Sequence, residues 1–94
     1  MAAKLSDAEI EQRLGDLADW SQEGNEIRKT FLLASFPMAI AFVVQVGFLA
    51  EAAGHHPDID IRWRNVSLAL TTHDAGGLSA KDFELAAQID EILG

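Results

Sequence analysis

The chain has 94 residues, a formal net charge of −8 and no cysteine, and 49% of its residues are hydrophobic. This length and composition predict one globular domain over residues 1–94, with a small core that favours oligomerisation. The absence of cysteine excludes disulfides and thiolate metal sites. The basic residues are scattered rather than clustered, which argues against direct binding of nucleic acid.

The N-terminal segment carries a helix-start signal. Ser6 and Glu9 form a capping-box pattern, and apolar residues follow at helical spacing, so we predict a helix from Asp7 to Ala18. No basic stretch followed by an apolar run precedes it, so no secretory signal is visible and we expect a cytoplasmic protein.

A β-hairpin is predicted next. Its strands are Trp20–Gln22 and Glu26–Leu33, and Gly24 and Asn25 form the turn. Alternation in the second strand puts its apolar residues on one face: Ile27, Phe31 and Leu33.

The most hydrophobic segment runs from Phe36 to Ala53, and Gln45 is the one polar residue before Glu51. A membrane span needs ~20 apolar residues, and Glu51 ends this run too early. We therefore predict a buried central helix, packed against both a sheet and a partner subunit, and no membrane insertion.

Two alternating segments, Asp58–Arg64 and Val66–Thr72, predict half-buried strands joined by a turn at Arg64-Asn65. Alternation places Trp63 on the apolar face, which predicts core packing. A second capping pattern starts a final helix over Ala80–Leu93. The order α-β-β-α-β-β-α predicts an α+β fold, with a four-stranded antiparallel sheet and three helices on one face.

All three histidines of the chain fall between Glu51 and Asp82. Imidazole can give and take protons near neutral pH. Its concentration around one turn and one strand end suggests acid–base chemistry on a bound organic molecule. The alternative is that His55, His56 and His73 are three unrelated surface or capping residues.

The spacing of this segment is specific. Glu51, three residues, His55-His56-Pro57, five residues, Trp63, nine residues, His73, eight residues and Asp82 resemble the signature of pterin-4a-carbinolamine dehydratases. The segment from Thr72 to Ser79 is similar to the strand-to-helix junction of that family. Two departures are a shorter hairpin over Gln22–Glu26 and an aliphatic Ile59 where animal members carry an aromatic residue.

The resemblance implies loss of water from a 4a-hydroxytetrahydropterin to give the quinonoid dihydropterin, with no metal or organic cofactor. It implies His55, His56 and His73 as the catalytic set. In that set, His55 and His73 act as the acid/base pair and His56 mainly holds the pterin. Further residues implied to bind the substrate are Pro57, Thr72, Asp74 and Ala75.

Three supporting residues have open assignments. Glu51 either ends its helix or orients His55. Asp82 is most simply a helix-capping acid. Trp20 either packs over the pocket or closes the hairpin.

Two other functions stay open at this point. The first is a non-catalytic pterin-binding or protein-assembly role, which the resemblance also allows. The second is a zinc site built from the three histidines, since three-His zinc sites exist. For either the enzyme or the binding module, we expect a homodimer or homotetramer.

Overall fold

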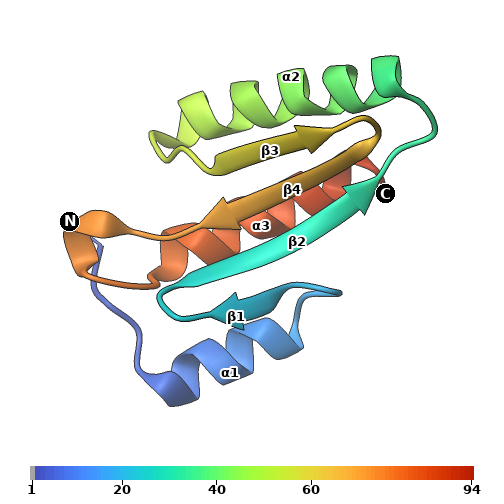
Figure 1. Ribbon diagram of the computed structural model, residues 1–94. Coiled ribbons are helices and arrows are strands. Elements are labelled where there is room, and N and C mark those ends of the chain that lie inside the picture. The colour runs from blue at the N-terminus through green and yellow to red at the C-terminus, as the bar shows by residue number, and fades with distance from the viewer. Residues whose placement is uncertain (1) are drawn as a thin grey trace.

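Within residues 2–94, which the computed structural model describes, four antiparallel strands form one sheet and three helices cover one of its faces (Figure 1). The α+β fold class and the order α-β-β-α-β-β-α are confirmed. The bounds of the elements are α1 (Asp7–Gly15), β1 (Ser21–Glu23), β2 (Glu26–Leu32), α2 (Phe36–Ala53), β3 (Asp58–Arg62), β4 (Asn65–Leu70), the 3-10 turn η1 (His73–Ala75) and α3 (Ala80–Ile92).

The strands lie in the order β1-β2-β4-β3, so β4 is central and β3 is an edge. Ile27 of β2 pairs with Leu70 of β4, and Phe31 pairs with Val66. These apolar side chains face the helices, because alternate residues of a strand point to opposite faces. On the open face, Thr30 and Ser67 hydrogen-bond across the pair at 2.8 Å.

Helix α2 has the bounds that its sequence predicts. The Ser35 hydroxyl accepts the Met38 N–H at 3.2 Å, and Gly54 ends the helix with a left-handed φ of 61°. Within one chain only one stripe of α2 is buried, so packing against the sheet is confirmed, and the expected packing of the outer face against a partner subunit stays a prediction. By length and composition α2 could cross a membrane, but its buried stripe packs on the sheet and α3. The stripe consists of Ala39, Phe42, Val46 and Ala50.

The β3–β4 hairpin differs from the prediction. Arg62 pairs with Asn65, so the turn consists of Trp63 and Arg64 rather than Arg64 and Asn65. Trp63 has a φ of 56° and its surface is 67% exposed, so core packing was a wrong prediction. All five β3 residues are exposed, because an edge strand is covered on fewer sides than a central one.

Helix α1 ends at Gly15, three residues before the predicted end. The Asp16 N–H bonds back to the carbonyls of Arg13 and Leu14, which closes the last turn. Asp19 then adopts a φ of 67°, and this left-handed residue turns the chain into β1.

The N-terminal capping box of α1 makes a prediction about acid stability. The Ser6 backbone N–H donates to the Glu9 carboxylate at 2.9 Å, and the Ser6 hydroxyl is also bonded; both lower the pKa of Glu9 below 4.5. A lowered pKa in the folded state stabilises the protein above pH 4.5, and this contribution is lost as pH falls through the folded pKa. Urea unfolding from pH 6 to pH 3 should therefore show that Glu9→Gln is less stable than wild type at pH 6. The difference should shrink towards pH 3, and a constant difference would contradict this.

Candidate active site

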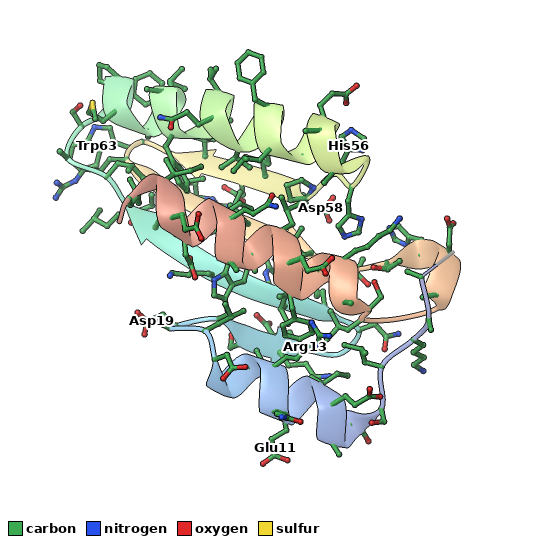
Figure 2. The ribbon with its side chains drawn as sticks, turned by 180° about the vertical axis from the view of Figure 1, so that it is seen from behind. Glu11, Arg13, Asp19, His56, Asp58 and Trp63 are labelled. Atoms are coloured by element: carbon green, nitrogen blue, oxygen red, sulfur yellow. The ribbon has the colours of Figure 1, made fainter. Side chains whose placement is uncertain are left out.

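Five of the ten predicted site residues line one surface hollow of about 270 Å³, which we call the histidine pocket. Three segments form it: the C-terminus of α2, the chain that follows β4, and the first turn of α3. In Figure 2, His56 lies at the end of α2 and marks this end of the molecule. The lining residues are Gly54, His55, His56, Thr71, Thr72, His73, Asp74 and Lys81.

The wall that carries His73 is a tight loop. Thr72 and Gly77 form two backbone hydrogen bonds, with N–O distances of 3.2 and 3.3 Å, and they close the loop around η1. Gly76 takes a left-handed φ of 76°, which glycine adopts without steric cost. The loop holds His73 and Asp74 out from the end of the sheet, where both side chains are exposed.

His55 is fixed by a buried carboxylate. Its Nε2 lies 2.5 Å from Oδ1 of Asp82, which is 27 residues further along the chain. The His55 side chain is 11% exposed, and the Asp82 side chain is fully buried. This contact sets the orientation of the imidazole ring and leaves Nδ1 as its second polar atom.

The other oxygen of Asp82 completes the network. Oδ2 accepts from the Thr72 hydroxyl at 2.8 Å and from the Ser79 backbone N–H at 2.9 Å. The Thr72 hydroxyl gives its proton to Asp82, so the Ser79 hydroxyl donates to Thr72 at 2.7 Å. Asp82 acts as the acceptor of these hydrogen bonds, so its contact through Oδ1 is best satisfied by an N–H of the His55 ring. In the neutral ring of His55, the proton is therefore on Nε2 and Nδ1 can accept another.

Asp82 thus has two functions at once. It caps α3 through Ser79, as its place in the sequence predicts, and it also holds His55. The capping interpretation was correct but incomplete.

Of the two alternatives left open for Glu51, the structure does not support the one in which it orients His55, because the hydrogen-bond partner of that ring is Asp82. Oε1 of Glu51 lies 2.8 Å from Nε2 of His56 instead. The two side chains are 81% and 66% exposed. An ion pair in water is weak, typically ~0–1 kcal/mol, so His56 is held less firmly than His55.

Three other predicted residues lie away from the pocket lining. Pro57 and Ala75 belong to the flanking segments, but neither lines the hollow. Trp20 is buried in the core, where its Nε1 donates to Asp90 of α3 and its ring meets Phe31 edge-on. Trp20 therefore helps to attach α3 to the sheet.

Two lining residues were missed by the sequence reasoning. Thr71 lines the pocket, and its hydroxyl donates to the Asn25 carbonyl at 2.5 Å. Lys81 brings an ammonium group to the same wall. A cation in the first turn of a helix opposes the helix dipole. The unusual position of Lys81, next to Asp82, is the sequence feature that could have identified it as a pocket residue.

Within the described residues 2–94, no three His, Cys, Asp or Glu side chains are grouped to hold a metal ion. The Nε2 atoms of His55 and His56 are directed at separate carboxylates. This geometry does not fit a three-histidine zinc centre, in which all three rings must point at one ion.

The pocket thus combines a histidine held by a loop, His73, with a histidine fixed by a carboxylate, His55. Residues 3–92 match the family model described as pterin 4 alpha carbinolamine dehydratase. The chain therefore belongs to the pterin-4a-carbinolamine dehydratase family.

Relatives and solved structures agree with this assignment. A protein of Roseiflexus sp. (strain RS-1) is 77% identical over 93 residues, which cover 99% of this chain and 100% of the relative. One of Chloroflexus aurantiacus (strain ATCC 29366 / DSM 635 / J-10-fl) is 69% identical, covering 97% and 98%. Both are provisionally named as pterin-4-alpha-carbinolamine dehydratases.

Two solved structures share the fold. A transcriptional coactivator/pterin dehydratase from Brucella melitensis has a TM-score of 0.93 at 27% identity, covering 97% of this chain and 99% of that one. A pterin dehydratase-like protein identified as a RuBisCO assembly factor in the alpha-carboxysome has a TM-score of 0.71 at 25% identity, covering 82% and 92%. The same fold therefore occurs in a protein described as a pterin dehydratase and in one described as an assembly factor.

Proposed function

We propose that this protein dehydrates a 4a-hydroxytetrahydropterin to the quinonoid dihydropterin. The observation that carries the proposal is the pairing of His55 with the buried Asp82 in a pocket that His73 also lines. Membership of the family supports the substrate class. The substrate is the carbinolamine that an aromatic amino-acid hydroxylase leaves, and the product is the quinonoid dihydropterin that a reductase can reduce again, so the reaction would support pterin recycling.

The reaction is an acid–base elimination. The N5 lone pair forms the C4a=N5 bond as the C4a–O bond breaks, the hydroxyl leaves as water after it gains a proton, and N5 loses its proton. His55 presents an unprotonated Nδ1 and is suited to accept the N5 proton. His73 is exposed, so it can deliver a proton to the hydroxyl and be reprotonated from water. The scheme needs no metal or organic cofactor.

Each proton transfer is expected to contribute measurably to the rate of dehydration. General acid and general base catalysis typically contribute ~10²–10⁴-fold each. His56, Thr72 and Asp74 line the same pocket and would hold the pterin by hydrogen bonds. The Asp82 network is buried and fully paired, so it keeps the base in place without reorganisation during the reaction.

The activity is tested by generating the carbinolamine in situ with an aromatic amino-acid hydroxylase. Its decay is followed by ultraviolet absorbance with and without this protein. Acceleration that is proportional to protein concentration is the expected result. Decay at the uncatalysed rate would exclude the dehydratase function.

We also propose that the functional form is a homo-oligomer built on β3 and the outer face of α2. Both carry exposed apolar side chains, and β3 has a free edge. In an antiparallel β3 pair centred on Asp60, Asp58 would face Arg62 of the partner subunit, and Ile59 would face the partner's Ile61. Opposite charges and apolar pairs across strands are favourable, although the two Asp60 carboxylates would be neighbours. The exposed apolar residues on these elements are Phe36, Met38, Ile40, Val44, Phe48, Ile59 and Ile61.

A charge-swap series tests this pairing. Arg62→Asp makes the outward charges of β3 all acidic, so it should shift the protein towards monomer in sedimentation equilibrium. The double variant Asp58→Arg/Arg62→Asp restores opposite charges and should recover the oligomer. An unchanged mass for Arg62→Asp, or a monomeric double variant, would contradict the pairing.

The alternative function is a non-catalytic binding or assembly module. The apolar surface of α2, where Phe48 is 74% exposed, is the observation that favours it. Pterin binding without acceleration of dehydration would support this alternative. We expect a cytoplasmic location for either function.

A further inference from the structure

A second hollow of about 370 Å³ lies beside the histidine pocket, and we call it the hairpin cleft. We propose that this cleft binds the substituent on C6 of the pterin and selects substituents that carry hydroxyl groups. The inference rests on the proposed dehydratase function and adds a determinant of substrate specificity. The lining residues of the hairpin cleft are Glu23, Asn25, Glu26, Thr71, His73, Gly76 and Gly77.

The hairpin cleft and the histidine pocket are adjacent. Thr71 and His73 line both hollows, so these two residues form the wall between them. A ligand that lies against His73 in the histidine pocket is therefore next to the hairpin cleft.

The chemistry of the ring gives the direction in which the substituent extends. The bond that breaks is at C4a, and the ring atoms that follow are N5 and then C6. C6 is therefore two bonds from the reacting carbon, and the first atom of its substituent is three bonds away. In the proposed pose, the C6 substituent passes His73 into the hairpin cleft, while N5 stays within reach of His55 in the histidine pocket. The aminopyrimidine end of the ring is directed away from the cleft.

The far wall of the cleft is the β1–β2 hairpin. The hairpin is fixed relative to His73 because the Thr71 hydroxyl donates to the Asn25 carbonyl at 2.5 Å, and because Ile27 pairs with Leu70. A wall that is fixed in this way is suited to select among substituents.

The lining of the cleft favours hydroxyl donors. The carboxylates of Glu23 and Glu26 offer four acceptor oxygens in total, and the Asn25 side chain offers both a donor and an acceptor. Nε of Arg28 lies 3.8 Å from Oε2 of Glu23, and Nη1 of Arg28 lies 3.5 Å from Oε1 of Glu26. The guanidinium group therefore partly neutralises both carboxylates. Arg28 itself lines a different hollow on the sheet surface. The Lys4 side chain lies beside Gly77 on the opposite rim.

Glu26 is the best single residue to test. Its side chain is 31% exposed, half the 62% of Glu23, so a hydrogen bond from a ligand would be better shielded from water. A hydrogen bond to a charged group is worth roughly 1.5–3 kcal/mol, which corresponds to about a tenfold or larger change in KM.

The experiment uses two carbinolamines with the same ring, one with a 6-methyl group and one with a 6-dihydroxypropyl group. We expect Glu26→Gln to raise KM for the dihydroxypropyl substrate about tenfold, with kcat and both constants for the methyl substrate within about twofold. Glu11→Gln is the matched control, because Glu11 extends from α1 into solvent (Figure 2). Asn25→Ala provides a second probe of the same wall in case Glu26→Gln folds poorly.

The outcomes separate the two proposals. If wild type accelerates neither substrate, the dehydratase function and this inference fail together. If wild type dehydrates both substrates but Glu26→Gln and Asn25→Ala leave their KM ratio unchanged, the hairpin cleft is not the subsite and the dehydratase function stands. A change in that ratio in either variant, absent from Glu11→Gln, supports the inference.

Discussion

His55→Ala is expected to lower kcat for dehydration by about 10²–10⁴-fold, because it removes the proton acceptor that Asp82 holds in place. His73→Ala should cause a loss of similar size, since His73 is the proton donor of the scheme. Both are measured as the enzyme-dependent decay of 4a-hydroxytetrahydropterin. His73 is exposed, so its replacement should leave the unfolding temperature unchanged.

His56→Ala is the matched control for this pair. His56 lines the same pocket, but its one hydrogen bond is to the exposed Glu51. Its removal should raise KM more than it lowers kcat, because it would affect binding of the ring rather than proton transfer. Equal loss of kcat in all three variants would contradict the division of roles, and full activity of His55→Ala would exclude His55 as the base.

Asp82→Asn is expected to have the largest combined effect on stability and activity. The amide matches the carboxylate in size but replaces one acceptor oxygen with a donor. It would face the Thr72 hydroxyl, the Ser79 N–H or Nε2 of His55, and at least one of these donors would lose its partner. A buried unsatisfied group costs about 1–3 kcal/mol, and the damaged cap adds about 1 kcal/mol. We therefore expect the free energy of unfolding to fall by about 2–4 kcal/mol.

Asp82→Asn is also expected to lower kcat, because it releases the imidazole ring of His55. Loss of a partner that orients a histidine typically costs roughly 10–100-fold or more, so kcat should fall at least tenfold at temperatures where the variant is folded. Ser6→Ala is the control, because it disrupts the exposed capping box of α1, and Ser6 does not line the pocket. It should cost about 1 kcal/mol and leave kcat unchanged. Asp82→Asn with wild-type kcat would show that Asp82 only caps α3.

The elements that could be predicted are those with local signals. Helix α2 has a serine N-cap, an apolar run and a left-handed Gly54, and each acts within a few residues. The turn at Gly24-Asn25 was likewise predicted correctly. Alternation also identified the apolar face of β2, with Ile27 and Phe31 in the core.

Burial of β3 could not be predicted from alternation. Alternation tells which side chains share a face, but not whether another element covers that face. Ile59 and Ile61 share the helix-facing side, yet they remain 40% and 37% exposed because β3 is an edge strand. Trp63 does not follow the alternation of the strand, because it lies in the turn, which begins one residue earlier than predicted.

The three histidines that line the pocket could be predicted from the sequence, but their hydrogen-bond partners could not. The resemblance placed His55, His56 and His73 together, and the structure places them on one pocket. The partners of these residues depend on tertiary contacts. His55 is bonded to Asp82 across 27 positions, while the nearer Glu51 is bonded to His56. Spacing alone does not distinguish these arrangements.

The central claim is that this pocket performs the elimination rather than only binding a pterin. Its most direct test is a single-turnover measurement, with protein in excess over freshly generated 4a-hydroxytetrahydropterin and binding of a stable dihydropterin measured in parallel. We predict a first-order decay that saturates with protein concentration and exceeds the spontaneous rate at least 10²-fold. Saturable binding of the dihydropterin with decay at the spontaneous rate would contradict the claim and identify a binding module.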